Sequence, residues 1–312
     1  MAAPSVPISA VVADDEIVLS KVTFWTRLRR HKLALAGIIV LGLMVLAAVL
    51  AGQLAPFDPN AIDNVHWQGQ PLPPCFQGSG QCGGHPLGTD EVGRDLLSRL
   101  LFGARISLTV GLFAVIMEVL IGATLGAIAG YYGKWVDYAL MRLTDVFLSI
   151  PLLPLLLVLT AIVAASSSKA ALSFGVIVVI IGALSWPAVA RLVRASFLSL
   201  REREFAEAAR ALGNNDGRII FRHLLPNAIA PIVVQATLDV ANVIILESTL
   251  SFLGLGIQPP TASWGNMLAN AQSNLQTAWW AAVFPGLCIL ITVLAINYIG
   301  DGLRDALDPN VR

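Results

Sequence analysis

The sequence has little charge for its length. Only 13% of its 312 residues are Asp, Glu, Lys or Arg, whereas a soluble domain carries about 25%. Apolar residues make up 56%, and the mean hydropathy is +0.74. The missing charge argues against a large water-soluble core and predicts a chain that lies mostly in lipid.

Other absences exclude whole classes of function. The formal net charge is zero and no basic tail occurs, so nucleic acid is not an expected partner. The phosphate-binding pattern G-x-x-x-x-G-K-[ST] is missing, so ATP must be bound by another polypeptide if it is used at all. Neither G-x-S-x-G nor H-E-x-x-H is present, and Asp239 has no second aspartate at similar depth in a neighbouring span. These gaps argue against an intramembrane protease.

Cysteine is scarce, with three residues in the chain. Cys75 and Cys82 lie close together in the polar stretch PPCFQGSGQCGGHP, and Cys288 lies in an apolar run. With only His66 and His85 nearby, the pair makes a poor zinc site, so no metal is expected. A disulfide is favoured if this loop faces an oxidising compartment. Two idle thiols and a metal site are the alternatives.

Six apolar segments are long enough to cross a hydrocarbon core of about 30 Å. The expected spans are residues 33–54, 106–130, 135–165, 171–193, 228–253 and 278–300. Several contain proline, which a bilayer tolerates where neighbouring helices or water satisfy the freed carbonyls. Gly122, Gly126 and Gly130 share one face and predict close helix packing. The predicted fold is an all-α membrane protein with six transmembrane helices.

The positions of Lys and Arg predict the orientation of these spans. Five basic residues precede the first span, whereas residues 55–104 hold two arginines against five acids. Seven arginines follow the fourth span: Arg191, Arg194, Arg201, Arg203, Arg210, Arg218 and Arg222. Both termini and the loop 200–227 are therefore predicted to be cytoplasmic, and the cysteine pair external.

The spans and flanks together predict the organisation of the chain. Residues 1–32 form a cytoplasmic segment, with disorder expected over 1–20, and residues 33–54 form the first helix. Residues 55–104 form an external loop, 105–301 a core of five helices, and 302–312 a cytoplasmic tail.

The charged stretch EFAEAARALGNNDGRIIFRHLLPN separates the fourth and fifth spans. Strong helix formers run from Glu202 to Leu212, and Gly213 suits a left-handed helix end. Asp216 can cap a second short helix that ends at Pro226. Alanines keep the first helix thin, so another protein could grip it closely. A solvated connector without a partner is the alternative.

EAARALG followed by HLLPN resembles the EAA coupling loop of ABC importer permeases. The residues in register are Glu207, Ala208, Ala209, Ala211, Gly213, Leu225 and Pro226. His223 stands where many members have isoleucine, and RHLLPN is similar to the peptide-transport branch. GTDEVGRDLLSRLLFGARISL, LSFLGLGIQPPTASWGNML and NYIGDGLRDALDP look like C-type subunits of dipeptide/oligopeptide permeases. The resemblance extends from about Phe24 onward, leaving out the cysteine-containing insert.

This resemblance implies a type I ABC importer permease in a bacterial cell membrane. Its implied partners are a homologous permease subunit, two ATPase subunits, an external substrate-binding protein and short peptides. ATP and Mg would be bound by the ATPase subunits, while this chain would bind no cofactor and would not be an enzyme by itself. The coupling helix would tilt the fifth span as the ATPases close. Nickel and glutathione importers share the family and remain alternatives for the substrate.

Polar residues inside the spans are candidates for the substrate path. Gln235, Asp239 and Asn242 fall on one face of the fifth span, and an acid at this depth should face protein or water. A peptide's ammonium and amide groups suit a carboxylate with carboxamides, whereas pairing with the partner subunit is the alternative for Asp239. Glu118 and Glu247 could likewise serve the substrate path or the protein interior, and a role in helix packing is favoured for both.

Two further charged groups have simpler interpretations. Arg142 and Asp145 are expected to pair within one helix. The acids of GTDEVGRD, with Arg94 among them, are expected to cap a surface helix before the second span rather than bind calcium.

Overall fold

The computed structural model describes residues 28–29, 31–67, 69–77, 82–166 and 174–307. Within these ranges the regular elements are helices, apart from isolated bridges that join Ile62 to Arg94 and Thr89 to Asp95. The stretch expected to be disordered, 1–20, lies outside the described residues, as does the end of the chain from residue 308.

Most expected spans correspond to single long helices. These are α2 (Lys32–Val49), α4 (Leu96–Tyr132), α7 (Phe174–Leu200), α10 (Leu225–Phe252) and α12 (Trp280–Leu307). The short α3 (Ala51–Leu54) follows α2. The 37 residues of α4 extend about 55 Å at 1.5 Å per residue. Within the described residues 82–95, no separate surface helix precedes this span. Asp95 instead caps α4 itself by accepting from the Ser98 amide.

The expected span at residues 135–165 is divided into two helices. α5 (Lys134–Ser149) and α6 (Leu152–Ser166) meet at a bend of 83°. Pro151 lacks the amide hydrogen that would continue the helix, and its ring disfavours helical geometry at Ile150, which is extended. Among the described residues, five helices are long and apolar enough to cross a membrane, or six if this bent pair forms one span.

Salt bridges hold α5 against α7. The expected pair of Arg142 and Asp145 is wrong, because Asp145 binds Arg191 of α7 and Arg142 lies over the Tyr138 ring. Arg194 of α7 binds Asp137 in the same way. Sequence spacing alone favoured a partner on the same helix, whereas the packing of α5 against α7 provides the actual partner.

The glycine face of α4 packs against α7, as predicted. A Cβ atom on Gly122 would approach the carbonyl oxygen of Trp186 to 2.8 Å, and one on Gly130 would approach that of Arg194 to 2.8 Å. Gly126 meets α7 between these two points. The small residues therefore allow the two backbones to approach closely.

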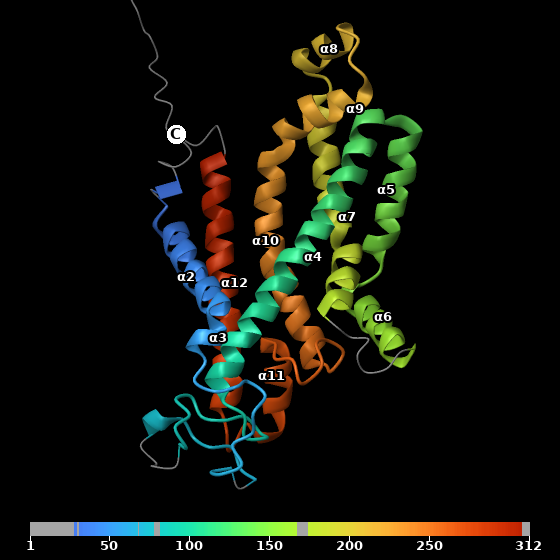
Figure 1. The fold of residues 1–312 in the computed structure, drawn as a ribbon. Helices are drawn as coiled ribbons and strands as arrows, with labels where there is room; N and C mark the ends of the chain where they lie inside the picture. Colours follow the sequence, from blue (N-terminus) through green and yellow to red (C-terminus); the bar gives the residue numbers. More distant parts are fainter. Residues whose placement is uncertain (1–27, 30, 68, 78–81, 167–173, 308–312) are drawn as a thin grey trace, which may run out of the picture.

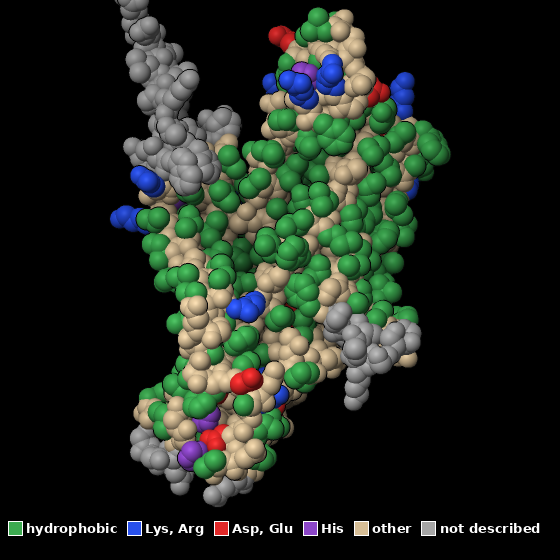
Figure 2. Space-filling view, viewed as in Figure 1, with side chains coloured by type: hydrophobic (Ala, Val, Ile, Leu, Met, Phe, Trp, Pro, Cys, Tyr) green, Lys and Arg blue, Asp and Glu red, His purple; other side chains and the backbone are tan. Residues whose placement is uncertain are grey.

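The molecule has two polar ends that are separated by an apolar surface (Figures 1 and 2). The elbow, residues 201–225, contains α8 (Glu204–Ala211), α9 (Asp216–Arg218) and the π-helical turn η4 (Ile219–Leu224). The cap, residues 55–95, contains η2 (Cys75–Gln77). Close to the cap lie α11 (Trp264–Ala271) and η5 (Gln272–Asn274). The start of α2 and the end of α12 lie toward the elbow (Figure 1).

Candidate functional site

The first helix of the elbow, α8, has an inner and an outer face. Ala206 and Ala209 are 0% and 5% exposed, and they join an apolar cluster with Ile219, Ile220 and Leu224. Phe197 and Val193 of α7 belong to the same cluster. Among the predicted coupling residues, Ala209 therefore packs inward, while Glu207, Ala208 and Ala211 are exposed.

Gly213 ends α8 as its backbone geometry requires. Its φ of +73° lies in the left-handed region, although the space around it is open. Glycine is favoured there by its conformational freedom rather than by its size. The Gly213 amide donates to the Arg210 carbonyl, and Asn214 donates to that of Ala209.

The second half of the elbow differs from its prediction at both ends. Asn215 caps α9 by accepting from the Arg218 amide at 2.8 Å, whereas Asp216 accepts from the Tyr131 hydroxyl at 2.7 Å. The expected helix end at Pro226 is also wrong, because η4 runs directly into α10 with Pro226 in its first turn. Leu225 is half-buried against the apolar cluster of the elbow. The elbow and α10 are thus continuous.

The outer face of the elbow carries apolar as well as charged groups. Phe205 and Leu212 are 39% and 82% exposed, and they lie about two turns apart on the same side. Lys and Arg side chains gather on this end in Figure 2. Both side chains are therefore accessible to a partner that covers this face.

The polar face predicted on α10 is built around Asp239. The Gln235 amide donates to both Asp239 oxygens, at 3.0 and 3.1 Å, and the Asn242 amide donates at 3.4 Å. Glu118 of α4 faces Asp239 within interaction range. Glu118 and Asp239 are 3% and 7% exposed. We call these two residues the acid pair.

Glu247 is buried differently, in a shell of hydroxyl groups. Ser251 donates to one of its oxygens at 2.7 Å and Ser107 of α4 to the other at 3.3 Å. The Ser107 hydroxyl in turn accepts from the amide of Trp264 at the start of α11. Glu247 therefore joins α4, α10 and α11, in agreement with the packing role that the sequence favoured.

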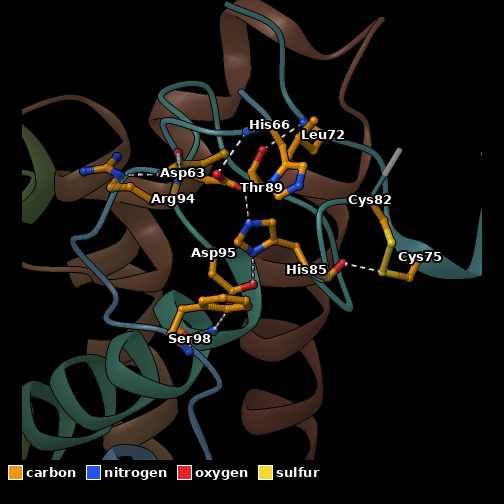
Figure 3. A network of polar contacts seen from close by, with 12 residues as sticks. Asp63, His66, Leu72, Cys75, Cys82, His85, Thr89, Arg94, Asp95 and Ser98 are labelled. Atoms are coloured by element: carbon orange, nitrogen blue, oxygen red, sulfur yellow. Dashed lines mark hydrogen bonds and ion pairs between the residues drawn. A yellow bond between two sulfur atoms is a disulfide. The ribbon is translucent and has the colours of Figure 1, made fainter. Parts of the chain in front are cut away.

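His85 occupies the centre of the cap (Figure 3). Its Nδ1 lies 2.9 Å from Asp95, and its Nε2 lies 3.1 Å from Asp63. His66 lies 2.8 Å from the same Asp63 oxygen. Burial opposes a charge on Asp63, but hydrogen bonds from His66, Val65 and His85 outweigh it and hold its pKa well below the usual range.

A disulfide closes the cap beside this network. Cys75 and Cys82 are bonded with a Cα–Cα distance of 5.0 Å (Figure 3). Within the described residues, no group of three or more His, Cys, Asp or Glu side chains is arranged to hold a metal ion. Burial and the neighbouring charge of Asp90 raise the pKa of Glu91.

Comparison with known proteins connects these features to transport. Residues 122–312 match the family described as the binding-protein-dependent transport system inner membrane component. This chain belongs to that family. Residues 22–74 of the permease also match the N-terminal transmembrane domain of oligopeptide transport permease C.

Several relatives resemble this permease over nearly its whole length. The dipeptide transport system permease protein DppC of Alkalihalophilus pseudofirmus is 42% identical, over 92% of this chain and 88% of that protein. The di/tripeptide permease DppC of Pseudomonas aeruginosa is 41% identical, over 93% and 92%. The glutathione transport system permease GsiD of Pectobacterium atrosepticum is 41% identical, over 97% and 95%.

A solved structure supports the fold of the permease. An inward-facing form of the MetNI methionine ABC transporter superposes with a TM-score of 0.54 at 19% identity. The match covers 67% of this chain and 97% of the other. The permease is therefore a multi-pass protein of the inner membrane with a type I ABC permease fold.

Sequence reasoning missed two features of the sites in this permease. The first is the packing of Ile219 and Ile220 against α8. In the sequence these residues are only part of an apolar run, and their partners on α8 follow from the fold. The contact of Glu118 with Asp239 joins residues more than a hundred positions apart, so no local pattern could reveal it. Their common depth in two spans was the one available signal.

Proposed function

We propose that this permease forms one half of the translocation path of an ATP-driven importer of dipeptides and oligopeptides. A homologous permease subunit forms the other half. Two ATPase subunits, which carry ATP and Mg, bind the elbows, and an external substrate-binding protein delivers peptide at the cap end. The chain itself holds no cofactor and is not an enzyme.

The orientation in this proposal rests on charge. The elbow region carries most of the arginines that flank the fourth span, and the cap has more acidic than basic residues. The positive-inside rule therefore puts the elbow in the cytoplasm with both termini, and the cap outside. A disulfide in the cap agrees with an oxidising compartment.

The division of α8 into two faces is the observation that carries the coupling role. Ala206 and Ala209 fix the helix to the cluster around η4, whereas Glu207, Ala208 and Ala211 are left exposed for a partner. Because η4 continues into α10, a displacement of α8 is transmitted along the same helix. Gly213 sets the turn between α8 and the rest of this lever, and a simple connector needs neither the cluster nor the continuity.

Peptides are the substrate class that the relatives favour. The relatives named above transport dipeptides, tripeptides or glutathione according to their names. Glutathione is the second candidate, because its permease matches the largest share of this chain among those relatives. Glutathione is itself a small peptide, so both candidates require a path for amide groups and a free ammonium.

A bulky residue on the outer face of α8 tests the coupling role. Ala208→Trp leaves the inner packing intact, so the permease pair is expected to assemble while recovery of the ATPase subunits falls at least about tenfold, as for a blocked interface centre. Ala61→Trp, at an exposed position in the cap, is the matched control and should recover them normally. Equal recovery from both variants would show that α8 is only a connector.

The substrate class needs a separate measurement on the assembled complex. ATP hydrolysis by the reconstituted importer, with its binding protein present, is expected to rise with a dipeptide. A rise with glutathione alone would select the second candidate. No response to either compound would reject the peptide assignment.

A further inference from the structure

We propose that the acid pair, Glu118 and Asp239, is the binding site for the free α-ammonium group of the transported peptide. This inference rests on the proposed peptide-import function. It adds a specific contact within the membrane, formed by two helices, between the permease and one chemical group of the substrate.

The acid pair lies deep in the membrane-spanning helices, where an ionisable side chain without a function costs free energy. Asp239 lies halfway along α10, and Glu118 lies near the middle of α4. Ionisable side chains at bilayer depth are rare, and they mark substrate or ion pathways when they occur. Two such groups on separate helices, facing one another, are a costly arrangement unless a ligand uses them.

The pair lacks a cationic partner. Among the described residues, neither carboxyl group forms a salt bridge with Lys, Arg or His. Two carboxyl groups in contact cannot both hold a full charge, so they share one proton and carry one net negative charge. A primary ammonium carries one positive charge and can take the place of that proton, which is then released to water.

The hydrogen-bonding groups also match an ammonium. The buried Oε2 of Glu118 finds no donor within the described part of the chain, and an ammonium supplies three. Gln235 and Asn242 use their NH₂ groups to orient Asp239, so their amide oxygens take no part in that contact. These oxygens suit the amide N–H groups of a peptide backbone.

A cavity lies beside this site, on the other side of Gln235. It measures about 490 Å³ and is lined by Leu192 of α7, Gln235 and Leu238 of α10, and Asp301 and Arg304 of α12. This volume lies within the usual range for small-molecule sites. Gln235 belongs both to the cavity wall and to the hydrogen-bond shell of Asp239, so the cavity and the acid pair share this side chain.

Glu247 shows how the same chain buries an acid that has a packing role. Both of its oxygens accept hydrogen bonds from serine hydroxyl groups. Glu118 has no such shell, and its neighbour is another acid. The contrast separates a ligand site from a structural carboxyl group.

Infrared difference spectra of the complete purified complex without its binding protein test the site directly. Adding a free dipeptide to the wild type is expected to remove the carbonyl band of the shared protonated carboxyl group. The N-acetylated dipeptide, which lacks the ammonium, should leave the band unchanged. An unchanged band with the free dipeptide, or equal changes with both, would overturn the inference. This comparison needs no variant.

Uptake by the reconstituted importer gives the second readout. Glu118→Gln and Asp239→Asn are each expected to lower kcat/KM for a free dipeptide at least about tenfold, because a charge-assisted contact is lost. Asp145→Asn, an exposed acid on α5, is the matched control and should transport normally. If Asp239→Asn fails to assemble, Glu118→Gln and the wild-type spectra decide the question.

The two levels of the proposal fail differently. Wild-type vesicles that import no peptide would reject the proposed function itself. Vesicles that import a dipeptide at the same rate with and without Glu118→Gln, and whose spectra do not change, would reject only the ammonium site.

Discussion

The cap and the elbow are stabilised by different kinds of contact. In the cap, charged and covalent contacts dominate, with His85 between two aspartates and a disulfide beside them. In the elbow, small apolar residues pack against one cluster, and the polar groups are mostly exposed. The first arrangement depends on the geometry of a few atoms, whereas the second depends on fitted surfaces.

This difference indicates which of the two ends of the molecule can move. A network of buried charges loses much of its stability when one partner is displaced, so it favours a single geometry. Apolar surfaces between α8 and η4 can shift together with α10 without leaving a charge unpaired. We therefore expect the cap to stay rigid while the elbow moves, and three experiments test the comparison.

The largest effect is expected for His85→Ala. It leaves Asp63 and Asp95 without the buried ring that joins them, which costs about 3 kcal/mol for a broken buried pair. The free energy of local opening, measured by amide hydrogen exchange across residues 57–98, reports the loss. His66→Ala is the matched control, because the His66 side chain is 53% exposed and an exposed pair contributes less than about 1 kcal/mol. Equal losses from both variants would contradict a cap organised by His85.

A smaller effect is expected when the inner face of the elbow is overpacked. Ala209→Leu forces a larger side chain against Ile219 and Leu224, at about 2 kcal/mol, and should speed amide exchange in η4. Ala208→Leu makes the same change on the outer face and should leave exchange unchanged. The assignment of the two faces is wrong if the variants reverse this order.

The smallest effect is an acid sensitivity confined to the cap. Because the folded pKa of Asp63 is depressed, its contribution to stability is complete above the ordinary aspartate pKa of 3.8 and is lost as the pH falls through the folded pKa. Protection of residues 63–67, corrected for intrinsic exchange, should therefore hold from neutral pH to about pH 4 and decrease below it. The Asp63→Asn variant should lack this decrease. Glu91 acts in the opposite sense because burial and the charge of Asp90 raise its pKa, so its protonation on folding is complete by about pH 4.5. Glu91→Gln should therefore leave the decrease below pH 4 unchanged.

Local patterns predicted the features that depend on one helix. The glycine face of α4 and the polar face of Gln235, Asp239 and Asn242 follow from helical spacing, and the structure contains both. Hydropathy and length likewise predicted the long spans. The coupling role of α8 came from its resemblance to a family loop and stays a prediction.

Features that depend on packing between helices were not accessible in this way. Asp145 forms its salt bridge with Arg191 on α7 and not with Arg142 on its own helix. Asp216 accepts a hydrogen bond from Tyr131 of α4 instead of capping α9. Pro151 was visible as a helix breaker, but its 83° bend depends on what α5 and α6 contact. In each case several partners were chemically equivalent, and only the fold selected one.

The π-helical turn η4 contains one residue more than an α-helical turn would need. The Leu225 amide bonds to the Ile220 carbonyl, five residues back instead of four. If this turn tightened to ordinary α-helical geometry, one residue would be released, and α10 would rotate by about 100° and shift by about 1.5 Å along its axis. A rotation of that size turns Asp239 away from Glu118. A change of hydrogen-bond pattern within this one turn is thus equivalent to a screw motion of the whole fifth span.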